Sequence, residues 1–290
     1  MIIQALIRTD EAATTGSMMS NRAMREDSIH TSQEPHPLPP GRWRVSQRWN
    51  NLLFAHWPVP ASSLAPLLPE GLQVDTFQGS AWLGIMPFWM DQFKVRGLPS
   101  IPGARSFPDL SLRTYVSEER SGTQGVLCLS LDASNLLAVA AGRAFYRLPY
   151  HWADMRMEQR TEREFAFYSR RRFAGVVFKA RYRGLGPSRK LAESRPGTLE
   201  HFLIERYCLF SVNSDGQPIR ANLHHSSWPL EEAEAEIEHN NLAEVLGLQL
   251  PDQQPVLHYS RQLAVYVWPA ELVRPAMVAR PVTVAATPTG

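Results

Sequence analysis

The sequence predicts a mainly antiparallel β fold with a few short helices. Runs in which apolar and polar residues alternate recur along the chain, and most are joined by short segments rich in Gly, Ser, Asn and Pro. Strands that are joined locally favour an antiparallel arrangement. The chain also lacks a Gly-rich phosphate loop, a dinucleotide fingerprint and a Gly-x-Ser-x-Gly motif, which are typical of α/β enzymes.

The composition excludes several classes of protein. With 290 residues, 44% of them hydrophobic, the chain is long enough for one large domain or two small ones. A net charge of +2 does not indicate a nucleic-acid-binding surface. No apolar run reaches the ~20 residues that span a bilayer, so we expect no membrane partner. Cys128 and Cys208 lie in apolar runs and not in a disulfide framework, which favours a cytoplasmic protein.

We expect one folded domain over residues 41–272. Residues 1–40 are poor in aromatic residues and rich in Ser, Thr, Pro and charged residues, which predicts a disordered N-terminal extension. A start codon placed too far upstream explains this segment equally well. The tail over residues 273–290 is also predicted to be disordered.

The strand predictions rest on alternation bounded by turn residues. An aromatic-rich segment over 42–60 opens the domain, and a hairpin is predicted over 72–90 with its turn at Gln78-Gly79. Pro87 limits pairing of the second hairpin strand, and residues 91–108 read as a long loop rich in Gly and Pro. Further strands are predicted over 112–119, 125–133, 162–173, 176–184, 218–230 and 255–270.

The helix predictions rest on capping residues and on the spacing of apolar residues. They cover 62–69 with Ser62 or Ser63 as N-cap, 135–145 with Ser134 or Asn135 as N-cap, 196–210 with Thr198 as N-cap, and the acidic segment 231–248.

The histidines do not predict a metal site. His224 and His225 are adjacent on a predicted strand, so their side chains point to opposite faces and only one can join a given site. No His-x-x-x-His or Cys-x-x-Cys pair is present. We therefore expect neither a metal nor another cofactor.

Arg113 and Tyr115 are candidate substrate-binding residues, because they share one face of a predicted strand. A buried arginine needs a negative partner. That partner is either a structural carboxylate (Glu200, Glu205 or Asp109), which we favour, or the carboxylate of a ligand, which a guanidinium binds with two parallel hydrogen bonds. Asp132, at a strand-to-helix junction, is expected to serve a local turn or cap.

Tyr150 and His151 follow Pro149 and are candidate catalytic residues. A histidine titrates near neutral pH and can act as acid or base in a cavity. A tyrosine can donate a hydrogen bond to a developing oxyanion. Packing in the core beside Trp152 is an equally good interpretation.

Eight segments together resemble the YqjF-like family, a bacterial family of unknown function placed among proteins with the acetoacetate decarboxylase-like fold. They include LRTYV, GVLCLSLDAS, LPYHWADM and GTLEHFLIERYCLF, and they span about residues 43–270 in order. The resemblance implies a cone-shaped, mainly antiparallel β-barrel with helices outside and a buried ligand cavity.

The resemblance also identifies what is missing for decarboxylation. In the decarboxylase branch a Gly-Arg-Glu segment leads to a turn whose lysine forms a Schiff base. Here Gly142 and Arg143 lead to Tyr150 at the position of that lysine, and to His151 at the position of its neighbour. The branch places a carboxylate on an earlier strand, which here matches Asp109. Because a Schiff base requires a primary amine, the resemblance implies the cavity without the Schiff-base reaction.

The expected function is therefore the binding of a small molecule that carries a carbonyl or a carboxylate. In the first alternative, the protein is a cofactor-independent acid/base enzyme with Tyr150, His151 and Asp109 as catalytic residues. In the second it only binds the ligand, and in the third side chains fill the barrel and its role is structural. A homo-oligomer is left open.

Overall fold

A computed structural model describes residues 36–98, 106–190 and 196–273. The predicted terminal extensions fall largely on residues 1–35 and 274–290, which lie outside the described residues. All described residues belong to one compact unit. No helix in the described part of the chain is both long and apolar enough to cross a membrane.

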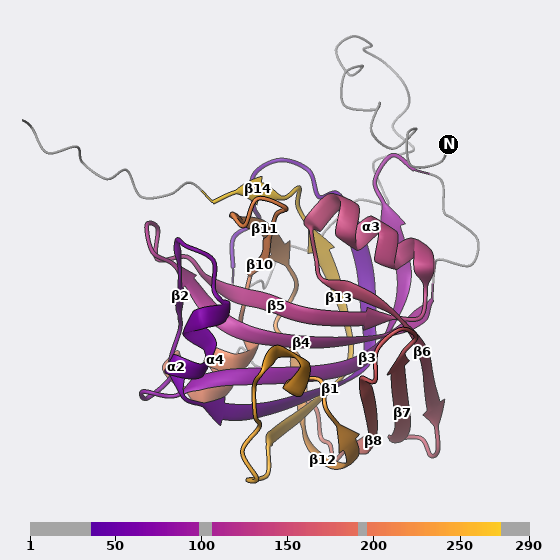
Figure 1. Cartoon of the computed structure of the whole chain (residues 1–290). Coiled ribbons are helices and arrows are strands. Elements are labelled where there is room, and N and C mark those ends of the chain that lie inside the picture. The colour runs from indigo at the N-terminus through magenta and orange to yellow at the C-terminus, as the bar shows by residue number, and fades with distance from the viewer. Residues whose placement is uncertain (1–35, 99–105, 191–195, 274–290) are drawn as a thin grey trace, which may run out of the picture. The chain divides into compact units, whose positions relative to one another are not determined.

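The described residues form one large, mainly antiparallel sheet (Figure 1). Its fourteen strands are β1 (Val45–Val59), β2 (Leu72–Val74), β3 (Ala81–Val95), β4 (Phe107–Glu118), β5 (Gln124–Ala133), β6 (Tyr150–Gln159), β7 (Glu164–Arg171), β8 (Val177–Gly184), β9 (Arg189–Lys190), β10 (Cys208–Val212), β11 (Pro218–His224), β12 (Pro229–Asn240), β13 (Val256–Val267) and β14 (Glu271–Leu272). Three short helices and two 3-10 turns join them: α2 (Ala61–Leu64), η3 (Ala65–Leu67), α3 (Leu136–Tyr146), α4 (Leu199–Ile204) and η5 (Glu244–Leu246).

The predicted fold class is confirmed. Neighbouring strands follow the order β14-β11-β10-β5-β6-β7-β8-β12-β13-β1-β3-β4-β2, with β9 beside β12. In addition β4 pairs with β5, and β11 pairs with β13, so the hydrogen-bonded order returns on itself. The pairings of β5 with β6 and with β10 are parallel.

The helix predicted over 135–145 is confirmed as α3. Asn135 is its N-cap, and its side chain accepts a hydrogen bond from the Ala138 backbone N–H at 3.1 Å. This bond satisfies one of the free N–H groups at the start of a helix. The helix connects the parallel strands β5 and β6 and packs beside both (Figure 1).

The acidic segment 231–248 does not form the predicted helix, and that prediction is wrong. Most of it lies in β12, where exposed Glu residues alternate with half-buried Ala and Ile residues. Glu234 accepts a hydrogen bond from Arg183 at 2.6 Å, and Glu236 accepts one from Arg181 at 2.9 Å, both across the pairing with β8. Cross-strand ion pairs and the period of two therefore outweigh the helix propensity of Glu and Ala.

The prediction of a hairpin over 72–90 is confirmed only at the turn and is wrong for the pairing of the two strands. Only Phe77 and Ser80 bridge across Gln78-Gly79, because β2 pairs with β4 and not with β3. The effect of Pro87 is confirmed: β1 has no partner for residues 86–88 of β3, whereas β4 pairs along them. Since β3 continues to Val95, the predicted loop over 91–108 starts later than expected.

Two of the other helices depart from their predicted form. Thr198 is confirmed as the N-cap of α4, since its hydroxyl accepts a hydrogen bond from the His201 N–H at 3.3 Å. That helix ends at Ile204, because the chain turns directly into β10. The N-cap of α2 is Pro60, and Ser63 instead donates its hydroxyl to the Pro60 carbonyl at 2.7 Å.

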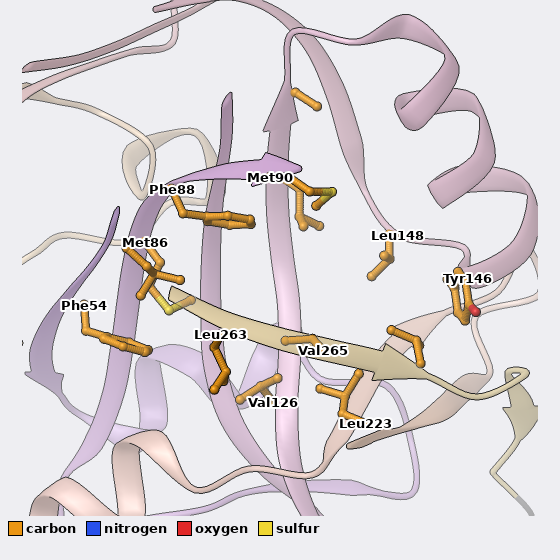
Figure 2. Close-up of a cluster of buried hydrophobic side chains, with 14 of the residues drawn as sticks. Phe54, Met86, Phe88, Met90, Val126, Tyr146, Leu148, Leu223, Leu263 and Val265 are labelled. Atoms are coloured by element: carbon orange, nitrogen blue, oxygen red, sulfur yellow. The ribbon is translucent and has the colours of Figure 1, made fainter. Parts of the chain in front are cut away.

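One hydrophobic cluster lies between α3 and the sheet. Figure 2 shows side chains from β3, β5 and β13 pointing into a common interior, which Tyr146 and Leu148 border at the end of α3. Met86, Phe88 and Leu263 are at most 5% exposed. The cluster positions the site, because the functional side chains enter the same interior.

Asp132 does not serve a local cap, and that expectation is wrong. Its carboxylate accepts hydrogen bonds from the Arg171 Nε at 2.6 Å and from the Ser169 hydroxyl at 3.0 Å. Both partners come from β7, and the Asp132 and Arg171 side chains are 1% and 5% exposed. The pair therefore ties β5 to β7 across the intervening strand β6.

We expect Asp132→Asn to lower the free energy of unfolding by ~3–5 kcal/mol, because it leaves the buried Arg171 charge without a partner. The matched control is Glu236→Gln, which breaks an exposed pair with Arg181 and should change stability by less than ~1 kcal/mol. Urea denaturation measures both. Equal effects of the two substitutions would contradict the structural role of Asp132.

Candidate functional site

A cavity of about 110 Å³ lies within this cluster. Its wall is mostly hydrocarbon and includes Val45, Leu52, Met86, Phe88, Met90, Phe93, Val95, Phe107, Val126, Leu131, Ala138, Ala141, Phe145, Leu148, Leu209, Leu223 and Val267. The polar or partly polar lining residues are Gln47, Trp49, Ser111, Arg113, Cys128, Tyr146 and Tyr150. Strands of the sheet and α3 thus enclose an apolar space with a few polar groups, which is typical of ligand sites.

A polar stripe runs along β4. Asp109, Ser111, Arg113 and Tyr115 occupy every second position of the strand, so their side chains share one face. All four residues are buried. Ser111 and Arg113 line the cavity, whereas Asp109 and Tyr115 are absent from its lining and lie further along the same face.

Arg113 is buried and has no acidic partner within ion-pair distance among the described residues. Its Nε atom lacks a hydrogen-bond partner there as well. The guanidinium carbon lies 5.9 Å from the ring centres of both Phe54 and Tyr115, close enough for a weak cation–π attraction. Arg113 therefore presents a positive charge to the cavity.

The structural carboxylates that we expected for Arg113 have other contacts. Glu200 lies 3.4 Å from the His258 Nε2, and Glu205 accepts a hydrogen bond from Tyr207. Asp109 accepts a hydrogen bond from Tyr150. The favoured expectation of a structural ion pair for Arg113 is therefore wrong for the described residues.

Tyr115 is held by hydrogen bonds within the fold. Its hydroxyl donates to the Leu203 carbonyl at 2.8 Å and lies 2.7 Å from the His56 Nε2. Because the tyrosine proton is used for Leu203, the His56 Nε2–H donates to the tyrosine oxygen. Burial, followed by the charge of Arg113, lowers the pKa of His56 well below its ordinary value. A neutral His56 thus positions Tyr115 beside Arg113.

Gly84 allows these side chains to approach one another. It pairs with His56 on β1 and with Arg113 on β4. A Cβ atom at position 84 would lie 2.9 Å from the His56 Cδ2, which is closer than ordinary contacts allow. The absence of a side chain at Gly84 therefore lets His56 lie over β3.

Asp109 and Tyr150 form a second polar pair. The Tyr150 hydroxyl donates to the Asp109 Oδ2 at 2.9 Å, and the Asp109 Oδ1 has no partner among the described residues. Burial raises the pKa of Asp109 to about 8, although the bond from Tyr150 acts in the opposite direction. Burial and the neighbouring Asp109 raise the pKa of Tyr150 as well. Near neutral pH the pair therefore holds both protons.

Tyr150 is fixed against α3. Arg143 of that helix donates its Nε–H to the Tyr150 carbonyl at 2.8 Å. Position 142 must be glycine for the tyrosine ring to lie there, since a Cβ would come within 2.6 Å of the ring. The Gly142-Arg143 pair thus sets the wall of the cavity.

His151 is not brought together with the other candidates. It follows Tyr150 on β6, so its side chain takes the opposite face, and it does not line the cavity. Burial, with the charges of Arg171 and Arg143, lowers its pKa to about 4. His151 is therefore neutral near pH 7.

Two polar groups in the wall were not singled out from the sequence. The indole Nε1 of Trp49 and the hydroxyl of Tyr146 are buried and lack hydrogen-bond partners among the described residues. Tyr146 follows Gly142 by four residues, so helical spacing placed it on the cavity side of α3. That spacing is the signal that could have identified it.

Cys128 also faces the cavity, but its chemistry is suppressed. It pairs with Arg113 across β4 and β5, and burial raises its pKa to about 12. A protonated thiol is a weak nucleophile. Among the described residues, no three His, Cys, Asp or Glu side chains converge in a way that could hold a metal ion.

We expect the stability of the protein to fall between about pH 4 and pH 8 because of Asp109. Its carboxyl is ionised above pH ~4 in the unfolded chain but stays protonated up to about pH 8 when folded. Asp109→Asn keeps a neutral acceptor for Tyr150 and should raise the free energy of unfolding at pH 7 by up to ~4 kcal/mol. Urea denaturation should show little gain at pH 4, and an equal gain at both pH values would contradict a buried, protonated Asp109.

Solved structures show the same fold. An acetoacetate decarboxylase from Legionella pneumophila is 13% identical, with a TM-score of 0.57 over 90% of this chain and 98% of that one. MppR, an enduracididine biosynthesis enzyme, is 13% identical with a TM-score of 0.56 over 81% of this chain and 89% of its own, and another of its structures contains pyruvate. At this identity the likeness shows the fold alone.

The family is shown by sequence. The uncharacterized protein YqjF of Bacillus subtilis is 39% identical over 232 residues, which cover 80% of this chain and 93% of that protein. The model of the DUF2071 family, described as "Uncharacterized conserved protein", matches residues 46–264. The match includes β3, β4, β5, α3 and β6, which carry the cavity. The chain therefore belongs to the DUF2071 family and is a YqjF-like protein with the acetoacetate decarboxylase-like fold.

Proposed function

We propose that the cavity binds a small organic molecule that carries a carboxylate, with a carbonyl as a second suitable group. The observation that carries this proposal is the buried Arg113, which faces the cavity and has no acidic partner among the described residues. A buried unpaired charge is unfavourable. A bound carboxylate removes that penalty and accepts parallel hydrogen bonds from the guanidinium.

The solved relatives support a carboxylate ligand for this kind of fold. MppR has been solved with pyruvate, and also with the condensation product of pyruvate and imidazole 4-carboxaldehyde. Pyruvate combines a carboxylate and a carbonyl, which are the two groups that this proposal names. An open volume of about 110 Å³ also favours a ligand over an interior filled by side chains.

The catalytic part of the proposal uses Asp109 and Tyr150. Near neutral pH both groups are protonated, so the pair can supply a proton to a carbonyl oxygen that lies beside Tyr150. Asp109 does not line the cavity and acts through Tyr150. Tyr115 holds Arg113 in place and makes no ligand contact. His151 takes no part in the proposed proton transfer, because it does not line the cavity.

A non-catalytic binding protein is the second candidate. It is favoured by the hydrogen bond in which the Tyr150 hydroxyl already donates to Asp109. The two candidates share the cavity and Arg113, and turnover separates them. An enzyme consumes a bound keto acid, whereas a binding protein returns it unchanged.

We expect Arg113→Gln to weaken the binding of pyruvate and of butanoate by at least ~30-fold, because removing one partner of a buried charge pair has a cost of ~2–5 kcal/mol. Arg113→Lys should bind with intermediate affinity, since lysine keeps the positive charge but cannot donate two parallel hydrogen bonds to a carboxylate. Arg181→Gln, which changes an exposed arginine, is the control and should bind like the wild type. Calorimetric titration measures these affinities, and unchanged binding by Arg113→Gln would refute the proposal.

We also expect that borohydride added with a β-keto acid traps no covalent adduct. Lys94 and Lys179 do not line the cavity, and Tyr150 offers no amine. Mass spectrometry of the intact protein is the measurement. A mass increase that maps to a lysine would show that a Schiff base forms after all.

A further inference from the structure

We infer that the ligand is a short monocarboxylate whose remaining part is hydrocarbon. This inference rests on the proposed function and names the ligand class of the same site. It concerns the part of the ligand other than its carboxylate, which the proposed function does not specify.

The wall of the cavity selects a hydrocarbon tail. Met86, Phe88, Val126, Leu131 and Phe145 face the interior along with other apolar side chains, and Figure 2 shows several of this cluster converging there. Burying each methylene against such a wall strengthens binding by about fourfold, which corresponds to ~0.8 kcal/mol. A polar tail would lose its water and find few partners.

The distribution of charge selects a single carboxylate. Arg113 is the one formally charged side chain among the described residues that line the cavity. An α-ammonium group would lie close to the guanidinium without an acidic lining residue to pair with. A second carboxylate at the far end would face apolar side chains. Amino acids and dicarboxylates are therefore excluded by the same arrangement that attracts a monocarboxylate.

The tail lies between Arg113 and α3. Arg113 and Asp109 are four residues apart on β4, which separates their backbones by roughly 13 Å. Tyr150 contacts Asp109, and Phe145 of α3 lines the same cavity. A carboxylate at Arg113 thus directs the rest of the ligand toward Tyr150 and Phe145.

The volume limits the length of the tail. A protein cavity of ~150 Å³ accepts benzene, which has six carbon atoms. A cavity of about 110 Å³ corresponds to about four to five non-hydrogen atoms on that scale. Propanoate has about five non-hydrogen atoms and butanoate about six, so the cavity is filled at about this chain length, and hexanoate, with about eight, exceeds it.

The test is a calorimetric titration of the full chain with acetate, propanoate, butanoate, hexanoate and octanoate, and with two charged analogues of butanoate. We expect affinity to rise about fourfold per methylene up to butanoate and to stop rising by hexanoate. The analogues 2-aminobutanoate and butanedioate should bind at least ~100-fold more weakly than butanoate, because each buries an uncompensated charge.

A variant of the wall supplies the matched control. Phe145→Ala enlarges the cavity at α3 and should shift the optimum to hexanoate or octanoate. Leu137→Ala changes an exposed residue of the same helix that does not line the cavity, and its optimum should stay at butanoate. A common optimum in both variants would overturn the placement of the tail.

The outcomes separate this inference from the proposed function. The inference of a monocarboxylate with a hydrocarbon tail is wrong if affinity does not depend on chain length. It is also wrong if butanedioate and 2-aminobutanoate bind as tightly as butanoate. The carboxylate proposal then still stands as long as Arg113→Gln weakens all of these acids. If affinity rises with chain length in the wild type and in Arg113→Gln alike, the carboxylate proposal fails and the hydrocarbon wall remains. If none of these acids binds, both the carboxylate proposal and the inference of a hydrocarbon tail are overturned.

Discussion

The site depends on one electrostatic constraint, a buried arginine without an acidic partner among the described residues. Arg113 is 7% exposed and faces a cavity whose wall is mostly hydrocarbon. An isolated charge in such surroundings is unfavourable, because it has lost water and gained little in return. Phe54 and Tyr115 offset part of this penalty through their ring faces. In our proposal the carboxylate of a bound ligand offsets the rest of this penalty.

The neighbouring polar groups are neutral and do not offset the positive charge of Arg113. His56 stays neutral because it is buried and lies near Arg113, and its proton is used to hold Tyr115. Asp109 is on the same face of β4, but burial keeps it protonated up to about pH 8, so it adds no negative charge near neutral pH. One end of the stripe is therefore cationic and the other is a neutral proton donor. In our proposal this asymmetry orients the ligand, with its carboxylate at Arg113 and its other end at Tyr150.

The parts of this arrangement that depend on local sequence could be predicted, and those that depend on distant contacts could not. Asn135 and Thr198 cap helices through bonds to residues three positions along the chain. Thr198 was the predicted cap, and Asn135 was one of two candidates. The strand β12 was missed, because Glu and Ala favour a helix and the arginines that pair with Glu234 and Glu236 lie on β8. Arg113 was recognised as an inward residue, but its lack of an acidic partner is a property of the whole fold. The resemblance matched Asp109 and Tyr150, which are forty-one positions apart in the sequence, to a carboxylate and a lysine of the decarboxylase branch. The hydrogen bond between the two residues fits that match.

A crystal structure of the full chain grown with 3-bromopropanoate, which matches butanoate in size, tests the central claim most directly, because the bromine can be located by its anomalous scattering. We expect the carboxylate within ~2.7–2.9 Å of the Arg113 guanidinium, the usual distance for a charge-assisted hydrogen bond, and the bromine in the cavity toward Phe145. An Arg113 side chain that is paired with a carboxylate of the protein, together with bromine outside the cavity, would contradict it.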